Sequence, residues 1–284
     1  MFRGWRVRGG VVVPPLGEVR PLVVGIVNVT PDSFFDGGRH AAFDAAVSHG
    51  LKLLAQGADL LDVGGESTRP GAATVSPQEE IDRTAKVVEA LVRAGALVCI
   101  DTRRPEVAEV ALEVGACAVN DVEGLRDPRM LDLCVRSAAG ACAMHMKGEP
   151  GTMQVSPSYA DVIEEVERFL LAASTRWYAA GLPADALALD PGVGFGKRIG
   201  HNLSLVARTS HLRARFPGHP WYLGLSRKGW IRDLPNTAPE SDRLAGSLGG
   251  ALAAANAGCD ILRVHDVAAT LEAWRAFQAC TVAA

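Results

Sequence analysis

Eight short apolar runs recur at regular intervals along this chain of 284 residues, and they restrict its fold more than any other feature. They lie at residues 22–27, 60–63, 97–100, 117–119, 141–144, 186–189, 221–225 and 261–264. Runs that are apolar throughout, rather than alternating with polar residues, are typical of strands covered on both faces, as in a parallel sheet. Eight parallel strands are enough to close a barrel.

Helix-length segments separate these runs. Ser76 begins a Ser-x-x-Glu capping box with Pro77 in the first helical position, and Gly95 follows the last expected turn. The same pattern, an apolar helix face that ends at a glycine, recurs between Val107 and Gly115. Other helices are expected at residues 41–56, 128–138, 159–180, 201–214, 240–257 and 267–279.

Alternating strands and helices with short connections favour a closed (β/α)8 TIM barrel over an open doubly wound sheet. No linker rich in Pro, Gly or Ser divides the chain, which indicates a single α/β domain. With 48% apolar residues the chain can bury a large core. We expect residues 21–284 to form the barrel and residues 1–20 to form an N-terminal arm or hairpin that closes its bottom.

Composition excludes several classes of protein. The net charge of −3 provides no global field for binding nucleic acid or an anionic membrane. No run is long enough to span a membrane and the N-terminus lacks the apolar region of a signal peptide, so a cytoplasmic address is expected. The six cysteines form no C-x-x-C pair, which favours free and mostly buried thiols over a disulfide or a zinc site.

Polar residues follow each of the eight runs. In a (β/α)8 barrel the chemistry lies on the loops after the strands, so these residues are expected to meet at one mouth. The set contains carboxylates, amides and cations: Asn28, Asp62, Asp101, Asn120, Asp121, His145, Asp190, Ser226, Lys228, Arg263 and His265.

Two carboxylates and one amide in this set, Asp101, Asp190 and Asn120, suit a flat ligand with an array of hydrogen-bond donors and acceptors. A 2-amino-4-oxo-pterin ring is such a ligand, because a carboxylate accepts from its amino group and the neighbouring ring N–H. The alternative that Asp101 caps the next helix stays open, since Thr102 and Pro105 follow it.

Four further residues, Arg69, Lys228, Arg263 and His265, can carry positive charge after strands two, seven and eight. Barrel enzymes often bind phosphate beside the last two strands. A departing pyrophosphate needs such donors because charge builds on it as its bond to carbon breaks. A single surface cation is usually only solvated, whereas a cluster of them at one end favours an anion site.

Three loops are rich in glycine, at residues 30–38, 64–71 and 190–197. The last reads DPGVGFGK, and its Lys197 is followed by Arg198. This order excludes a nucleotide P-loop, in which Ser or Thr follows the lysine.

Eight segments resemble, in order, the sequence blocks of the dihydropteroate synthases. They are GIVNVTPDSFFDGG (25–38), LDVGGESTRPGA (61–72), IDTRRPEVAEVAL (100–112), VNDVEGL (119–125), MHMKGEPGTMQ (144–154), LDPGVGFGK (189–197), GLSRKG (224–229) and RVHDV (263–267). Together they span almost the whole chain after residue 24, which makes the combination highly specific.

This resemblance implies that the chain joins 6-hydroxymethyl-7,8-dihydropterin diphosphate to p-aminobenzoate, giving 7,8-dihydropteroate and pyrophosphate. It also implies a homodimer and a role for each residue that matches the family's motifs. The pterin would be held by Asp101, Asn120, Asp190 and Lys228 and lined by Val122 and Met144. The diphosphate would be contacted by Thr68, Arg69, Arg263 and His265. Phe195 would face p-aminobenzoate, and Asn28 would help to hold Mg2+.

The reaction implied by the resemblance is dissociative. Pyrophosphate departs first and leaves a delocalised pterin cation, which an ionised Asp101 would stabilise electrostatically. The aniline nitrogen then attacks the exposed methylene group. No covalent enzyme intermediate is needed, in keeping with the lack of a cysteine or serine paired with a base.

Two alternatives remain at this stage. One is a pterin-binding methyltransferase that passes a methyl group to a corrinoid, and the other is a non-catalytic pterin-binding paralogue. The chain departs from the family pattern at Gly229, where many relatives carry a side chain near p-aminobenzoate. The pair Arg103–Arg104 has no role that the sequence can assign.

Overall fold

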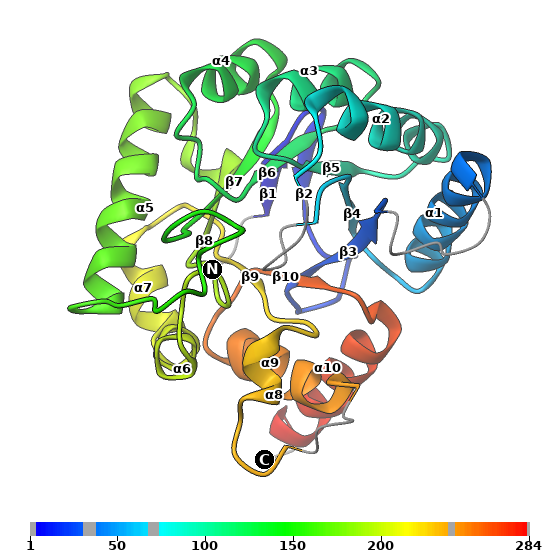
Figure 1. Cartoon of the computed structure of the whole chain (residues 1–284). Coiled ribbons are helices and arrows are strands. Elements are labelled where there is room, and N and C mark those ends of the chain that lie inside the picture. The colour runs from blue at the N-terminus through cyan, green and yellow to red at the C-terminus, as the bar shows by residue number, and fades with distance from the viewer. Residues whose placement is uncertain (1–3, 31–37, 68–73, 238–241, 283–284) are drawn as a thin grey trace.

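A computed structural model describes residues 4–30, 38–67, 74–237 and 242–282 of the chain. Its centre is a barrel of eight parallel strands (Figure 1), in the order β8-β7-β6-β5-β4-β3-β10-β9. A parallel bridge between Leu189 and Trp221 joins β8 to the segment that leads into β9 and closes the ring. The predicted (β/α)8 barrel is therefore confirmed. The strands are β3 (Leu22–Asn28), β4 (Leu60–Gly64), β5 (Val98–Asp101), β6 (Ala118–Asp121), β7 (Gly140–Met144), β8 (Leu187–Asp190), β9 (Tyr222–Gly224) and β10 (Ile261–Val264).

Helices surround the strands as an outer ring (Figure 1). They are α1 (Gly38–Ala55), α2 (Pro77–Arg93), α3 (Pro105–Glu113), α4 (Pro128–Ser137), α5 (Val162–Ala179), α6 (Ile199–Ala207), α7 (Thr209–Arg215), α8 (Gly229–Arg232), α9 (Leu244–Asn256) and α10 (Val267–Val282), with a 3-10 turn η2 (Ala184–Ala186) before β8. Local sequence sets several ends: Ser76 Oγ accepts from the backbone N–H of Glu79 at 3.1 Å, and Gly95 takes a positive φ of 89° after α2. No helix of the described chain is both long and apolar enough to cross a membrane.

Alternate residues of each strand face opposite sides of the sheet, and this parity divides the core in two. Residues on one parity pack outward against the helices, among them Val23, Leu61 and Ile100. Residues on the other parity form a second cluster inside the barrel, among them Val24 and Cys99. Further toward the carboxyl end of each strand, the inward-facing positions are occupied by polar residues that the sequence predicts for the site.

A hairpin of β1 (Trp5–Val7) and β2 (Gly10–Val12) lies at the amino ends of the barrel strands. Trp5 is fully buried in the inner cluster, 6.2 Å from the ring of Tyr222, and its Nε1 donates to the carbonyl of Ala186. The backbone N–H of Arg8 donates to the carbonyl of Cys117 at 2.9 Å. The hairpin thus covers the end of the barrel opposite the polar mouth.

The structure differs from the sequence prediction in two helical segments. The single helix expected at 201–214 is two helices, α6 and α7, which meet at Arg208. The helix expected at 240–257 begins at Leu244. Within α9, an added Cβ at Gly246 would lie 2.2 Å from Ile231 and one at Gly250 would lie 3.2 Å from Trp230. These two glycines therefore allow close packing within the chain.

Candidate active site

The residues predicted for the site lie at or just beyond the carboxyl ends of the strands. Their positions are Asn28 on β3, Asp101 on β5, Asn120 on β6, Val122 after β6, Met144 on β7, Asp190 on β8, Phe195 in the loop after β8, Lys228 before α8, Arg263 on β10 and His265 after β10. Thr68 and Arg69 lie outside the described residues.

Arg263 joins three strands of the barrel through its side chain. Its Nε donates to Asp62 Oδ2 on β4, and its Nη2 donates to Asp101 Oδ2 on β5 at 2.5 Å. Asn120 Nδ2 on β6 donates to the same Asp62 oxygen at 3.1 Å. Because Asp62 is fully buried, this network fixes the guanidinium from inside the barrel.

The charges in this network are unequal in number. Burial opposes the positive charge of Arg263, but Asp62 and Asp101 outweigh it and hold the arginine pKa above its ordinary value. Burial raises the pKa of Asp101, and the Arg263 guanidinium opposes that shift. The neighbouring Asp62 adds to the upward shift, and the pKa of Asp101 is about 7. When Asp101 is ionised, two carboxylates face one guanidinium and the group is negative, which suits a neighbouring cation.

Asp190 and Lys228 form a second group. The N–H of Gly192 donates to Asp190 Oδ1 at 2.7 Å, and Lys228 Nζ donates to the carbonyl of Val193 at 2.6 Å. The same ammonium lies 4.5 Å from the centroid of the Phe195 ring, a cation–π distance. Burial lowers the pKa of Lys228 to about 8, although Asp190 acts in the opposite direction.

Gly224 on β9 lies between the two groups. A Cβ added there would lie 3.6 Å from Lys228 Nζ and 3.8 Å from Arg263 Cβ. Burial raises the pKa of Asp190, while Lys228 and Arg263 both lower it, so all three charges act on one another. The carboxylates and cations at the carboxyl ends of β5, β8 and β10 and after β9 therefore meet at one mouth.

An apolar surface adjoins these charges. Val122, Met144, Met146 and Met153 are buried together, and the partly exposed ring of Phe195 packs against them. A thioether is polarisable and packs well against aromatic rings. The surface is suited to the face of a flat heterocycle.

The loop after β8 is held by a buried lysine. Lys197 Nζ donates to His145 Nδ1 at 2.9 Å and to the carbonyls of Gly192 and Phe195 at 2.9 and 3.1 Å. Burial, reinforced by Lys197, lowers the pKa of His145 to about 2, so this ring is neutral and can accept. Gly192 has a φ of 70°, and a Cβ there would lie 1.8 Å from the His145 carbonyl oxygen. Glycine is thus required where this loop crosses β7.

Asn28 ends β3 and His265 directly follows β10, and these two strands are neighbours in the ring. His265 Nδ1 lies 3.1 Å from Ser226 Oγ, and the His265 N–H donates to the same oxygen at 3.2 Å. Asn28 is partly exposed at the end of β3, paired in register with Gly64. Both residues therefore lie at the carboxyl ends of neighbouring strands, at the same mouth.

The model of the pterin binding enzyme family matches residues 24–265. Dihydropteroate synthase of Escherichia coli (strain K12) is 46% identical over 260 residues, which is 91% of this chain and 91% of that protein. The chain belongs to the dihydropteroate synthases of this family. It is an enzyme of folate biosynthesis and a transferase.

Solved dihydropteroate synthases share the fold as well. The Xanthomonas albilineans enzyme with 4-aminobenzoic acid has a TM-score of 0.84 and 45% identity, covering 92% of this chain and 93% of that one. The same enzyme in complex with 7,8-dihydropteroate has a TM-score of 0.82 and 43% identity, covering 92% and 94%. These likenesses favour the synthase over the corrinoid methyltransferase.

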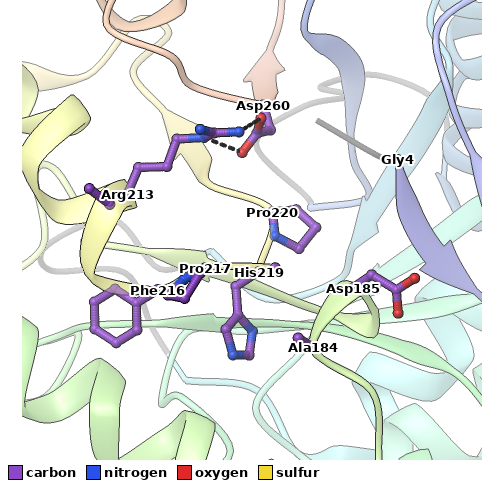
Figure 2. Close-up of a pocket in the computed structure, with 11 residues that line it drawn as sticks. Gly4, Ala184, Asp185, Arg213, Phe216, Pro217, His219, Pro220 and Asp260 are labelled. Carbon is purple, nitrogen blue, oxygen red and sulfur yellow. Dashed lines mark hydrogen bonds and ion pairs between the residues drawn. The ribbon is translucent and has the colours of Figure 1, made fainter. Parts of the chain in front are cut away.

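A cavity of about 540 Å3 lies away from this site (Figure 2). Its lining residues precede β8, β9 and β10, so it opens at the amino ends of the strands. Arg213 there pairs with Asp260 at 2.9 Å, and His219 lies 2.8 Å from Ser174 Oγ. Because the chemistry of such barrels lies at the carboxyl ends of the strands, we assign the reaction to the mouth around Arg263 and not to this cavity.

Sequence reasoning gave no role to Asp62 or Lys197. A signal for Asp62 was present, since a carboxylate inside the apolar run LLDV must be buried and therefore paired. In the sequence, Lys197 serves only to exclude a P-loop, and nothing there shows that its ammonium turns back toward His145. Pairings of this kind depend on the distance between loops, which a sequence does not contain.

Proposed function

We propose that the mouth of this dihydropteroate synthase binds the pterin between Asp101, Asn120, Asp190 and Lys228, with Val122 and Met144 against the ring. The diphosphate would be contacted by Thr68, Arg69, Arg263 and His265, and p-aminobenzoate would face Phe195. The observation that supports this assignment best is the Arg263 network, which sets a cation beside two carboxylates at the same mouth as Asp190 and Lys228.

Each group has a task in the proposed reaction. Arg263 and His265 donate to the oxygens of the departing pyrophosphate, which takes the electron pair of the C–O bond. The negative group of Asp62, Asp101 and Arg263 stabilises the pterin cation that this departure leaves. The amine of p-aminobenzoate then forms the new C–N bond and loses a proton to solvent or to the product pyrophosphate.

Asn28 would help to hold Mg2+ at the rim. No cluster of three His, Cys, Asp or Glu side chains that could bind a metal occurs among the described residues. The amide oxygen of Asn28 fits the preference of Mg2+ for oxygen ligands, with substrate phosphates and waters as its other ligands. When bound, the ion would neutralise charge on the diphosphate.

Turnover of the purified protein tests the assignment. With pterin diphosphate, p-aminobenzoate and Mg2+, we expect equal amounts of 7,8-dihydropteroate and pyrophosphate. Absence of this product, together with methyl transfer from a methylated pterin to a corrinoid in a separate assay, would favour the methyltransferase. Binding of both substrates with no turnover would favour the non-catalytic paralogue. The expected homodimer stays a prediction, which sedimentation of the same sample tests.

A further inference from the structure

The loop after β8 contains a glycine at every second position. Gly192, Gly194 and Gly196 all have a positive φ, of 70°, 88° and 61°. Glycine has little conformational preference of its own and loses more entropy than any other residue when its backbone is fixed. The shape of this loop, and with it the position of the Phe195 ring, therefore depends on partners outside the loop.

Gly194 is held from both sides. Its N–H donates to Asn202 Oδ1 of α6 at 2.8 Å, and its carbonyl accepts from Gln154 Nε2 at 2.6 Å. Its Cα lies against Lys228, since an added Cβ would be 3.0 Å from Lys228 Cδ. The backbone that leads into Phe195 is thus fixed between a helix, the loop after β7 and the stem of Lys228.

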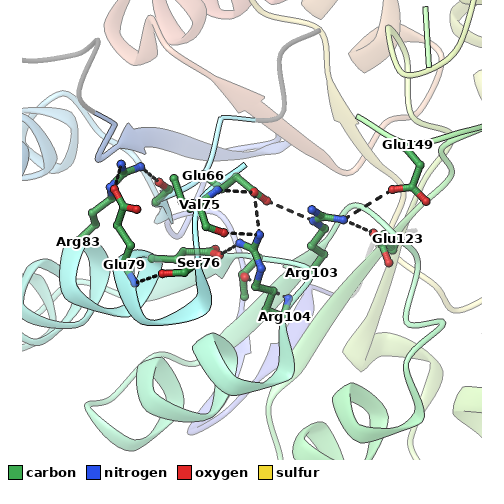
Figure 3. A network of polar contacts seen from close by, with 12 residues as sticks. Glu66, Val75, Ser76, Glu79, Arg83, Arg103, Arg104, Glu123 and Glu149 are labelled. Atoms are coloured by element: carbon green, nitrogen blue, oxygen red, sulfur yellow. Dashed lines mark hydrogen bonds and ion pairs between the residues drawn. The ribbon is translucent and has the colours of Figure 1, made fainter. Parts of the chain in front are cut away.

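The two side chains that bind Gly194 differ in how firmly they are held. Asn202 is only 3% exposed and lies on α6, in the outer ring of helices (Figure 1). Gln154 lies in the loop after β7, and its bond to Gly194 is exposed. Glu149 of the same loop is 76% exposed and lies 3.9 Å from Arg103 (Figure 3), a contact that restrains the loop little. Asn202 is therefore the firmer of the two anchors.

Packing does not explain an amide at this buried position of α6. A leucine there would bury more apolar surface, and a buried amide costs free energy unless it is hydrogen-bonded. The bond from the Gly194 N–H offsets that cost and also satisfies a backbone donor of the loop. The amide of Asn202 thus stabilises the loop rather than the helix.

The Phe195 ring takes its place from the same loop. Its centroid lies 4.5 Å from Lys228 Nζ, and the ring packs against the apolar cluster that contains Met144 and Met153. Lys228 Nζ also donates to the carbonyl of Val193 at 2.6 Å. A shift of the backbone between Val193 and Phe195 would therefore move the ring relative to the ammonium.

We propose that Asn202 is a positioning residue for the binding of p-aminobenzoate. By accepting from the Gly194 N–H, it sets where the ring of Phe195 stands at the mouth. This inference rests on the proposed function, in which Phe195 faces p-aminobenzoate. Asp190, proposed to hold the pterin, accepts from the Gly192 N–H instead, so pterin binding should depend on Asn202 far less.

Asn202→Leu tests the proposal, because it removes the acceptor and keeps a side chain of similar size. Calorimetric affinity for p-aminobenzoate, measured with pyrophosphate in place of the pterin diphosphate, should fall by about tenfold or more. KM for p-aminobenzoate should rise in parallel, while affinity for the pterin diphosphate should change by less than about threefold. Asn202→Asp keeps an acceptor oxygen and should restore part of the loss. If Asn202→Leu does not fold, Asn202→Ala removes the same acceptor without bulk and should give the same pattern.

A double variant shows whether Asn202 acts through Phe195. Phe195→Ala should itself weaken p-aminobenzoate binding, and Asn202→Leu should then cause little further loss in the Phe195→Ala protein. Leu205→Ala is the matched control, because Leu205 is fully buried on the same helix and belongs to the core around the strands. It should lower the midpoint of thermal unfolding and leave both affinities unchanged.

Four results would each overturn the proposal: additive losses from Asn202→Leu and Phe195→Ala, equal losses of affinity for both substrates, a Leu205→Ala effect as large as that of Asn202→Leu, or an unchanged p-aminobenzoate affinity in folded Asn202→Leu. Failure of the proposed function gives a different result, since Phe195→Ala alone would then leave p-aminobenzoate affinity unchanged.

Discussion

Asp62 carries a charge in the interior of the barrel, where its partners are Arg263 and Asn120. Asp62→Asn would leave the Arg263 guanidinium with one carboxylate partner in place of two. We expect the free energy of unfolding to fall by about 3 kcal/mol, the cost of breaking a buried pair. We also expect kcat/KM to fall by about 100-fold as Arg263 shifts. Urea denaturation and steady-state kinetics measure the two effects, and an active, fully stable variant would contradict the assigned role.

The buried Lys197 side chain should make the stability of the protein depend on pH. Burial lowers its pKa from 10.5 to about 7. Between these values the unfolded chain holds a proton that the folded chain has lost, so this group makes the folded state more stable as pH rises. The contribution changes by at most about 1.4 kcal/mol per pH unit.

Lys197→Met removes this contribution. The difference in free energy of unfolding between the unmutated protein and Lys197→Met should therefore move in favour of the unmutated protein as pH rises above about 7. Urea denaturation at several pH values measures it. Parallel pH profiles for the two proteins would show that Lys197 keeps its ordinary pKa in the folded state.

Among single residues, sequence could predict which groups occupy the mouth but not how they pair. Asp101 and Asp190 directly follow apolar runs and Arg263 lies near the end of one, and the alternation of side chains along a strand brings all three to one face. The bond from Arg263 to Asp62 depends on the packing inside the barrel. The hydrogen bonds that Arg104 donates to Glu66 and to the Val75 carbonyl depend on how neighbouring loops fold back.

At the scale of elements, the loop after β8 requires glycine at a defined point. Gly192→Ala would bring a Cβ within 1.8 Å of the His145 carbonyl at a φ of 70°. We expect a loss of more than about 1 kcal/mol in stability and weaker pterin binding, because the Gly192 N–H also orients Asp190.

Gly200→Ala is the matched control for this variant. Gly200 lies in α6 with nothing within 4 Å of an added Cβ, so alanine should raise stability by up to about 1 kcal/mol and leave pterin binding unchanged. Thermal unfolding and calorimetry compare the two. Similar behaviour of Gly192→Ala and Gly200→Ala would contradict the crossing of β7 described above.

Element boundaries were predictable where the sequence has a local stop signal. Ser76 and Gly95 mark the two ends of α2, and the structure has the helix at Pro77–Arg93. No Gly or Pro marks the break at Arg208 between α6 and α7, so the apolar periodicity of residues 201–214 predicts a single helix. Strand bounds differ by one or two residues because apolar runs do not show where pairing stops.

Across the whole molecule, the N-terminal hairpin and the candidate site lie at opposite ends of the barrel. Trp5 is fully buried beneath Tyr222 at the end covered by the hairpin. Trp5→Ala should lower the free energy of unfolding by about 3–5 kcal/mol. The folded fraction should retain its KM values, since the site lies at the other end. A changed KM at temperatures where the variant is fully folded would show that the two ends are coupled.

The barrel itself was predictable because eight apolar runs with helices between them allow few other arrangements. The role of the first twenty residues could only be guessed. Nothing in the sequence shows that Trp5 enters the interior, because its partners, Tyr222 and Ala186, are remote along the chain.

Substitution of Asp101 by asparagine tests the central claim most directly, since the carboxylate is proposed to stabilise the cation formed during the reaction and to bind the ground state only in part. Single-turnover rates and calorimetric affinity for the pterin diphosphate should be measured on the same preparation. We predict that Asp101→Asn lowers the rate by about 100-fold or more while the affinity falls far less. Equal losses of rate and affinity, or an unchanged rate, would contradict the account.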